Sequence, residues 1–206
     1  MPSIAILSDL DGTLIDSKAS VIRAFEWWAE LRRLPPGVAE RLPHGRPTAA
    51  AAAVLAPHLD AAAEGELLDE RQSEDTEGVV ALPGAHDLLA THPRLAIVTS
   101  CTIPLAHARL TAAGLPTPAT LVTPELTSRG KPDPEPYLLG AALLGASADE
   151  CVVLEDAPAG VAAGRAAGMK VIALLTTHAR AELPGATAYV TDLTELGSAL
   201  NVLGLD

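Results

Sequence analysis

Two pairs of acidic residues have the types and spacing that bind a divalent cation. Asp9 and Asp11 are separated by one residue, so their side chains point to the same face of an extended strand. Glu155 and Asp156 form the second pair. Neighbouring carboxylates repel one another unless a cation or a proton lies between them, and Mg²⁺ prefers such oxygen ligands. The pairs therefore predict a magnesium site, although a solvated Asp-Gly turn or an acidic helix N-terminus would explain either pair alone.

Two hydroxyl residues and one lysine are candidates for binding a phosphate group. Thr99 and Ser100 stand where an apolar run gives way to a helical stretch, and hydroxyls and backbone N–H groups at such turns bind anions. Lys131 lies in a loop that prolines on both sides of Asp133 stiffen. A helix N-cap and a solvated surface lysine are the alternatives. Together with the acids, these residues predict chemistry on a phosphate.

Short apolar runs must position these residues. Longer stretches of helical character separate most of the runs, and this alternation predicts an α/β fold with a Rossmann-like, mainly parallel sheet. Ligands of such sheets bind beyond the carboxyl ends of the strands, and the candidate residues follow the ends of four runs. The expected strands are Ile4–Leu7, Leu95–Val98, Thr120–Val122, Val152–Leu154, Val171–Leu174 and Ala188–Val190.

The interval from residue 16 to residue 77 has no strand signal and predicts a helical insert. Its expected helices are near Lys18–Leu34, Pro47–Leu55 and Asp60–Glu74. We therefore expect a catalytic core of residues 1–15 and 78–206 and an inserted helical domain of residues 16–77. His44 and Arg46, in a loop of this insert, are candidates for binding substrate, with solvated loop residues as the alternative.

The overall composition excludes several classes of protein. The 206 residues are 49% hydrophobic and carry a formal net charge of −12, and an acidic surface repels nucleic acid and anionic membranes. The N-terminus has no basic segment, no stretch is a convincing membrane span, and two cysteines do not make a disulfide framework. We expect a cytoplasmic, monomeric enzyme whose partner is a small phosphorylated metabolite, without nucleic acid or membrane.

Four motifs resemble those of the haloacid dehalogenase superfamily of phosphohydrolases, over essentially the whole chain. A narrower likeness to hexitol, sugar and glycerol phosphate phosphatases, in the subgroup that includes β-phosphoglucomutase, rests on His44-Gly45-Arg46 and on residues 76–85. Ser8 and Cys101 depart from the usual pattern without removing a catalytic group. The motifs are Asp9-Leu10-Asp11-Gly12-Thr13-Leu14, Thr99-Ser100, Lys131 within Gly-Lys-Pro-Asp-Pro-Glu-Pro-Tyr, and Glu155-Asp156-Ala157-Pro158-Ala159-Gly160 with Gly164 and residues 167–169.

The resemblance implies a role for each motif residue. Asp9 would be the nucleophile and a metal ligand. Asp11 would be the general acid and then the general base, and its backbone carbonyl would bind the metal. Thr99 or Ser100 would hydrogen-bond the phosphoryl oxygens, and Lys131 would bridge Asp9 and the phosphate. Asp156 would bind Mg²⁺, with Glu155 near the metal, directly or through water.

The insert would correspondingly be the cap domain of the family, with His44 and Arg46 contacting substrate. We therefore expect a Mg²⁺-dependent phosphatase that acts on sugar or polyol phosphates through a phospho-aspartate. A phosphomutase of the β-phosphoglucomutase type and a phosphoglycolate phosphatase are the nearest alternatives. A phospho-acceptor signalling domain uses similar groups, but its acids are typically adjacent and it lacks an insert.

Overall fold

The structure is a computed structural model, and it describes residues 4–38, 41 and 45–205. One six-stranded sheet has the order β5-β4-β1-β6-β7-β8, and all of its neighbouring strands are parallel. The predicted α/β class with a parallel sheet is confirmed. The strands are β1 (Ala5–Ser8), β4 (Leu95–Val98), β5 (Thr120–Val122), β6 (Cys151–Glu155), β7 (Lys170–Leu174) and β8 (Ala188–Val190).

The register of the three central strands aligns their carboxyl ends. Ser8 on β1 is opposite Ile97 on β4 and Leu154 on β6. The residues that follow these strands therefore meet at one edge of the sheet. β1, β4 and β6 are buried along their whole length, as expected of parallel strands covered on both faces.

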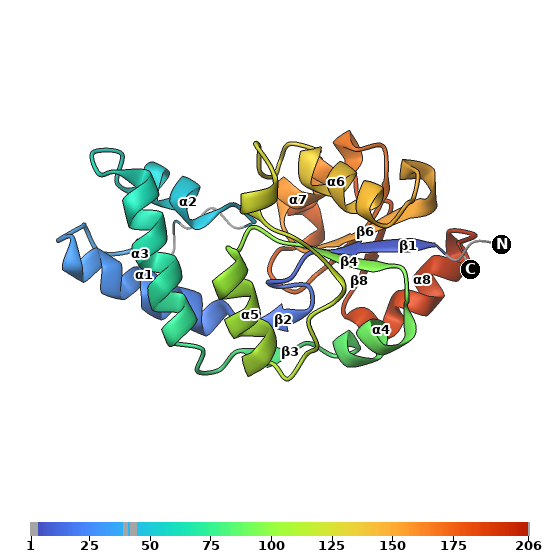
Figure 1. The fold of residues 1–206 in the computed structure, drawn as a ribbon, viewed down its shortest axis with the longest axis horizontal. Coiled ribbons are helices and arrows are strands. Elements are labelled where there is room, and N and C mark those ends of the chain that lie inside the picture. Colours follow the sequence, from blue (N-terminus) through green and yellow to red (C-terminus); the bar gives the residue numbers. More distant parts are fainter. Residues whose placement is uncertain (1–3, 39–40, 42–44, 206) are drawn as a thin grey trace.

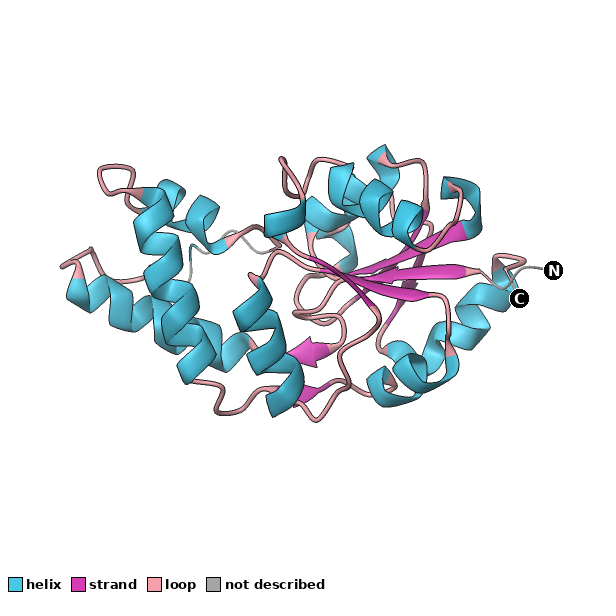
Figure 2. Cartoon of the chain, in the orientation of Figure 1, coloured by secondary structure: helices cyan, strands magenta, loops and turns pink. Residues whose placement is uncertain are grey.

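Helices cover both faces of the sheet, as Figure 2 shows. Successive residues of β1 pack into different cores: Ile6 belongs to the core beneath α4, α5 and α8, whereas Leu7 belongs to the core beneath α6 and α7. This alternation follows from the two-residue period of a strand. The helices are α4 (Ala85–Thr91), α5 (Ile103–Ala112), α6 (Glu135–Leu143), α7 (Pro158–Ala166) and α8 (Leu196–Val202).

Three further helices form the insert, which lies beyond the end of the sheet that is remote from the two termini (Figure 1). They are α1 (Lys18–Leu31), α2 (Thr48–Leu55) and α3 (Ala61–Glu74). Asp60 begins α3, because its side chain accepts hydrogen bonds from the backbone N–H groups of residues 62 and 63. α1 ends three residues before the expected Leu34, since Arg33 adopts a positive φ of 54° that no helix accommodates.

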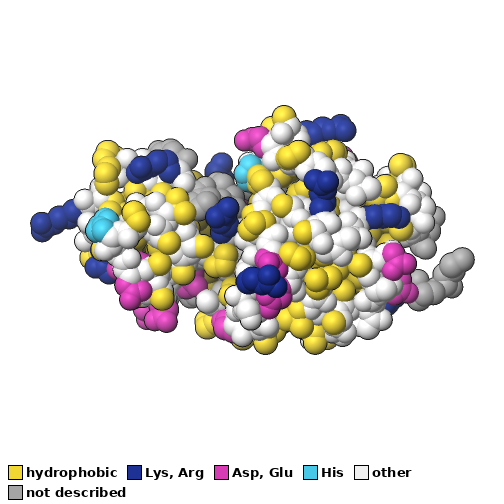
Figure 3. Space-filling view, turned by 90° about the horizontal axis from the view of Figure 1, so that it is seen from above, with side chains coloured by type: hydrophobic (Ala, Val, Ile, Leu, Met, Phe, Trp, Pro, Cys, Tyr) yellow, Lys and Arg dark blue, Asp and Glu magenta, His cyan; other side chains and the backbone are white. Residues whose placement is uncertain are grey.

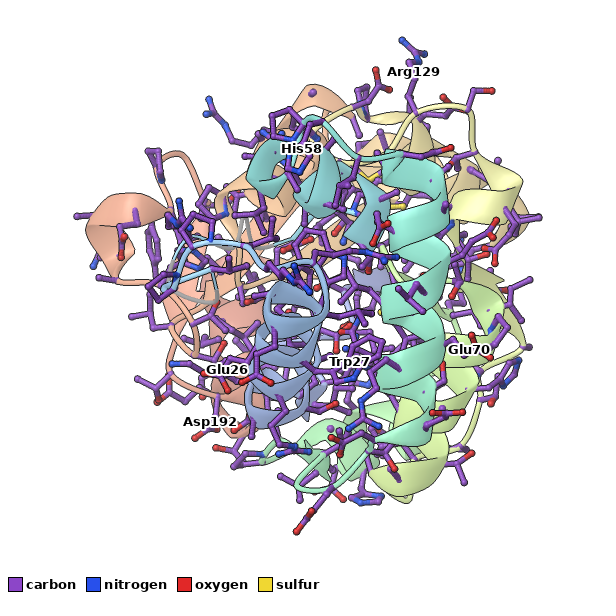
Figure 4. All side chains as sticks on the ribbon, turned by 90° about the vertical axis from the view of Figure 1, so that its left-hand side faces the viewer. Glu26, Trp27, His58, Glu70, Arg129 and Asp192 are labelled. Atoms are coloured by element: carbon purple, nitrogen blue, oxygen red, sulfur yellow. The ribbon has the colours of Figure 1, made fainter. Side chains whose placement is uncertain are left out.

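The insert has a hydrophobic core of its own. Trp28, on α1, is fully buried in this core, and its indole Nε1 donates a hydrogen bond of 2.6 Å to Glu64 of α3. Trp27 lies between α1 and α3 (Figure 4), with the guanidinium of Arg71 5.7 Å from its ring centroid.

Seen from above, the insert and the sheet domain form two lobes (Figure 3). Of the described helices, none is both long and apolar enough to cross a membrane.

A two-stranded antiparallel ribbon joins the insert to the sheet domain. β2 (Ile15–Asp16) pairs with β3 (Val80–Ala81), so the chain leaves and re-enters the sheet domain side by side. We did not predict this ribbon, because two-residue strands are too short to show the alternation of polar and apolar residues by which strands are recognised.

Candidate active site

The candidate residues at the carboxyl ends of β1 and β6 contact the ammonium group of Lys131 at this edge of the sheet. Lys131 Nζ lies 2.6 Å from Asp9 Oδ1, 2.7 Å from Glu155 Oε1 and 2.9 Å from the carbonyl oxygen of Val98. All three N–H bonds of the ammonium are therefore used. We refer to Asp9, Lys131, Glu155 and Asp156 as the core cluster. Each of the four is at most 5% exposed.

Glu155 holds Lys131 in place and has no free oxygen. Its Oε1 accepts hydrogen bonds from Lys131 and from the Tyr137 hydroxyl at 2.7 Å. Its Oε2 accepts the backbone N–H groups of residues 156 and 157 at 3.1 and 3.2 Å. Gly160 makes room for this carboxylate, because a Cβ at that position would lie 1.7 Å from Glu155 Oε1.

Asp156 is held by two threonine hydroxyls. Thr13 Oγ1 donates to Asp156 Oδ1 at 3.2 Å, and Thr177 Oγ1 donates to Asp156 Oδ2. Gly12 brings the backbone that follows Asp11 against this carboxylate: its φ is +82°, and a Cβ there would lie 2.2 Å from Asp156 Oδ2. Only glycine fits this close approach, which brings the Asp11–Gly12 backbone beside the second acidic pair.

The core cluster concentrates more negative charge than Lys131 alone offsets, and this shifts the pKa values of its members. Burial raises the pKa of Asp9 to about 7, with Lys131 opposing the rise and Glu155 adding to it. Burial, followed by the charges of Glu155 and Asp9, raises the pKa of Asp156 well above its ordinary value. For Lys131, burial lowers the pKa, but the carboxylates of Asp9 and Glu155 more than offset this and raise it.

The donor set fits a divalent metal. Oxygen atoms of Asp9, Glu155 and Asp156 lie within 4.8 Å of one another. Because both oxygens of Glu155 already accept two hydrogen bonds each, its lone pairs are taken. Asp9 Oδ2, by contrast, has no hydrogen-bond partner among the residues that the structure describes. We therefore regard Asp9 and Asp156 as the carboxylates that remain able to bind a metal ion.

A cavity of about 440 Å³ lies between this edge of the sheet and the insert. Most of the predicted site residues line it: Asp9, Asp11, Thr99, Ser100, Asp156 and Arg46. Lys131 and Glu155 are not among its lining residues: Lys131 contacts Asp9, and Glu155 contacts Lys131. His44 lies outside the described residues. On the insert side the lining combines charged and apolar side chains, namely Lys18, Glu26 and Arg46 with Val21, Ile22, Phe25 and Ala51.

The two hydroxyl residues after β4 differ in their contacts. The Thr99 side chain is buried, and its Oγ1 accepts the backbone N–H of Cys101 at 3.1 Å. Ser100 Oγ donates instead to the carbonyl oxygen of Gly45, in the insert, at 3.2 Å. Thr99 thus belongs to the sheet edge, whereas Ser100 connects that edge to the insert.

Asp11 has partners that we did not predict. Its Oδ1 is 2.5 Å from Ser17 Oγ and 2.8 Å from Arg109 Nη1, and its Oδ2 is 2.9 Å from Cys101 Sγ. Burial and the neighbouring Asp11 charge raise the pKa of the Cys101 thiol well above its ordinary value, which keeps the thiol protonated as a donor. Cys101 is therefore a contact of Asp11 as well as a small buried side chain.

Tyr137, Thr177 and Arg109 were missed by sequence reasoning. Tyr137 lies within the quoted Gly-Lys-Pro-Asp-Pro-Glu-Pro-Tyr segment, so its proximity to Lys131 in the chain was a signal that could have identified it. Thr177 follows β7, whose carboxyl end faces the same edge. Arg109 stands in the middle of a helix, where no local feature distinguishes it.

Comparisons with known proteins agree on one family. Residues 5–168 match the family model described as haloacid dehalogenase-like hydrolase. Hexitol phosphatase A of Escherichia coli is 46% identical over 175 residues, which cover 82% of this chain and 81% of that protein. Validoxylamine A 7'-phosphate phosphatase of Streptomyces hygroscopicus is 36% identical over 208 residues, covering 92% of this chain and 94% of that protein.

Solved structures show the same fold. A hydrolase from Pseudomonas syringae superposes with a TM-score of 0.86 at 29% identity, covering 98% of this chain and 99% of that one. The similarity therefore includes both the sheet domain and the insert.

Proposed function

The chain belongs to the haloacid dehalogenase-like hydrolases, and on that premise we propose that it is a Mg²⁺-dependent phosphatase of small sugar or polyol phosphates. One observation carries the proposal. Lys131 fixes one oxygen of the buried Asp9 carboxylate, while the other oxygen has no partner among the described residues and Asp9 lines a cavity of about 440 Å³. A carboxylate held in this way is suited to attack a bound phosphate ester.

Asp9, Asp156 and the backbone carbonyl of Asp11 would hold the metal. Glu155 would act through Lys131, since its oxygens are taken by hydrogen bonds. When bound, Mg²⁺ supplies positive charge that offsets the carboxylates and the phosphoryl oxygens. In a protein with a net charge of −12, this local charge lets an anionic substrate approach.

Asp9 would form the covalent intermediate. The Asp9 carboxylate attacks phosphorus, the bond from phosphorus to the alcohol oxygen breaks, and Asp11 gives a proton to that oxygen. The Thr99 and Ser100 hydroxyls hydrogen-bond the phosphoryl oxygens, and Lys131 offsets their charge. In the second half-reaction Asp11 accepts a proton from water, whose oxygen attacks phosphorus and releases phosphate from Asp9.

The insert would be a cap domain, residues 16–77, that chooses the substrate and excludes water. Arg46 lines the cavity and would contact hydroxyl groups of the substrate, with His44 beside it in sequence. The apolar side chains of Val21, Ile22 and Phe25 suit the carbon chain of a polyol. The substrate class is supported by the activities that the names of the two phosphatase relatives state.

We place the enzyme in the cytoplasm as a monomer. Both cysteines, Cys101 and Cys151, are buried and free, which agrees with a reducing compartment.

Phosphate release from a panel of esters tests the proposal. The panel holds hexitol, hexose and deoxyhexose phosphates, glycerol phosphate, phosphoglycolate and β-glucose 1-phosphate, each with Mg²⁺ and with EDTA. We expect release that depends on Mg²⁺, fastest with a hexitol or sugar phosphate, and strong impairment by Asp11→Asn. Isomerisation without release would instead identify a phosphomutase, and a long-lived acyl phosphate on Asp9 would identify a phospho-acceptor.

A further inference from the structure

The guanidinium of Arg109 is buried between the sheet domain and the insert. Arg109 lies on α5, and its side chain is 4% exposed. Its Nη1 is 2.8 Å from Asp11 Oδ1 and 3.0 Å from Cys101 Sγ, and its Nη2 donates to Gln72 Oε1 on α3 at 2.7 Å. One side chain therefore contacts both the proposed acid–base residue and the insert.

Burying this charge is costly. An ion pair out of water is often no more stable than an apolar pair of the same size, and Arg109 Nε is buried without a hydrogen-bond partner in the part of the chain that the structure describes. Stability alone is therefore a weak reason for an arginine at this position. Arg109 also lines the cavity, so its contacts belong to the site.

The two oxygens of Asp11 have unequal partners. Oδ1 accepts from a guanidinium and from the Ser17 hydroxyl, whereas the thiol of Cys101, a weak donor, is the one described partner of Oδ2. Arg109 thus fixes the carboxyl group through Oδ1 and leaves Oδ2 able to give or accept a proton. The Asp11 side chain is 25% exposed, so this group still reaches the cavity.

The insert contributes to the position of Arg109. Gln72 is 2% exposed, and its own side chain is fixed because Nε2 donates to the carbonyl oxygen of Leu68 at 3.1 Å. α3 packs directly on α5 (Figure 1). Gln72 therefore orients the guanidinium only while α3 rests on α5.

We propose that Arg109 is a positioning residue that holds the Asp11 carboxyl group toward the leaving oxygen, with Gln72 of the insert orienting Arg109. This inference rests on the proposed function, because Asp11 acts in it as the general acid. Small displacements of a catalytic group cost much of its effect. The packing of the insert on α5 thereby affects the position of the Asp11 carboxyl group through the side chain of Arg109.

Substrates with different leaving groups test the inference. A polyol phosphate needs a proton on its departing alkoxide, whereas p-nitrophenyl phosphate releases nitrophenolate without one. For Arg109→Met we expect kcat/KM to fall at least about 10-fold with the polyol phosphate and by less than about 3-fold with the aryl ester. Arg109→Lys should recover part of the loss, because a lysine keeps the charge but cannot contact Asp11 and Gln72 together.

Two further variants complete the experiment. Gln72→Leu should show the same substrate split with a smaller loss, and it carries the test if Arg109→Met fails to fold. Arg23→Met, which removes the 2.6 Å ion pair of Arg23 with Asp75, should affect both esters equally.

Equal losses of kcat/KM on the two esters, a rise in KM alone, or no change in either variant would overturn the positioning role. These results would not contradict the proposed phosphatase function, since phosphate release by the wild-type protein is measured in the same assay. Wild-type protein that releases phosphate from neither ester would refute the proposed function, and this inference with it.

Discussion

The core cluster and the part of the cavity that the insert lines, called the wall below, differ in how firmly their side chains are held. Each core-cluster residue is at most 5% exposed, and Lys131 and Glu155 use every donor or lone pair they have. On the wall, Lys18, Glu26 and Arg46 are exposed. Within residues 4–38, 41 and 45–205, none of these three forms an ion pair.

The difference suits the core cluster to catalysis and the wall to substrate recognition. Groups that stabilise charge in a transition state act best when they are fixed beforehand, and the sheet edge provides this for the core cluster. Exposed side chains with few partners adapt to different substrates. We therefore expect substitutions in the core cluster to abolish turnover on every ester and substitutions in the wall to change the preference among esters.

The largest effect is expected from Asp9→Asn. The amide cannot attack phosphorus, so turnover should fall at least about 10⁴-fold on every ester. Because burial disfavours the Asp9 carboxylate and raises its pKa, the neutral amide should leave the melting temperature without Mg²⁺ unchanged or higher. Phosphate release and thermal unfolding measure the two effects. Exposed Asp149→Asn is the control, and full activity of Asp9→Asn would refute the assigned nucleophile.

Lys131→Met should impair both activity and stability. Its loss leaves Asp9 and Glu155 buried without their cation, and breaking a buried ion pair in this way costs about 3–5 kcal/mol of folding free energy. Turnover should fall about 10³-fold as the charge next to the phosphate is lost. Denaturant titration and kinetics on each ester measure these changes.

Lys170→Met, at the half-buried start of β7, is the matched control and should be active. A stable Lys131→Met protein would show that the core cluster is less tightly coupled than its contacts indicate.

Removal of Mg²⁺ should matter more as the pH rises. Without metal, the folded protein holds the Asp9 proton with a pKa of about 7 against an ordinary value of 3.8. The folded state then binds more protons than the unfolded state, so stability falls as the pH rises from about 4 to about 7.

Added Mg²⁺ offsets the charge of the ionised Asp9 carboxylate. It should raise the melting temperature by at least about 3 °C at pH values near 8, and by less at about pH 5. Differential scanning fluorimetry with Mg²⁺ and with EDTA measures the gain. A gain that is larger at low pH would contradict the assignment of Asp9 as a metal ligand.

The smallest effect is expected from Arg46→Ala in the wall. KM for a hexitol or sugar phosphate should rise about 5–10-fold, equivalent to roughly 1 kcal/mol, whereas p-nitrophenyl phosphate should be nearly unaffected. Steady-state kinetics on the two esters measure the split. Arg41→Ala, in the same segment but not lining the cavity, is the control, and equal effects of Arg46→Ala on both esters would exclude recognition by this wall.

Much of the site was predictable from sequence because its residues follow strands. Asp9, Thr99 and Asp156 each come directly after a strand that begins with an apolar run, and parallel strands bring their carboxyl ends to one edge of a sheet. The helices of the insert were predictable for a similar reason, since their apolar periodicity and caps are local features. Order along the chain was therefore enough to assemble these groups.

Tertiary structure alone decided which partner each group has. The sequence left open whether Glu155 meets a metal directly or through water, and the structure shows that Lys131, Tyr137 and two backbone N–H groups donate hydrogen bonds to its oxygens. Arg109 meets Asp11 and Gln72 because α5 packs beneath α3. A side chain in the middle of a helix carries no local sign of what will pack against it, since burial and hydrogen-bond partners arise only when distant segments come together.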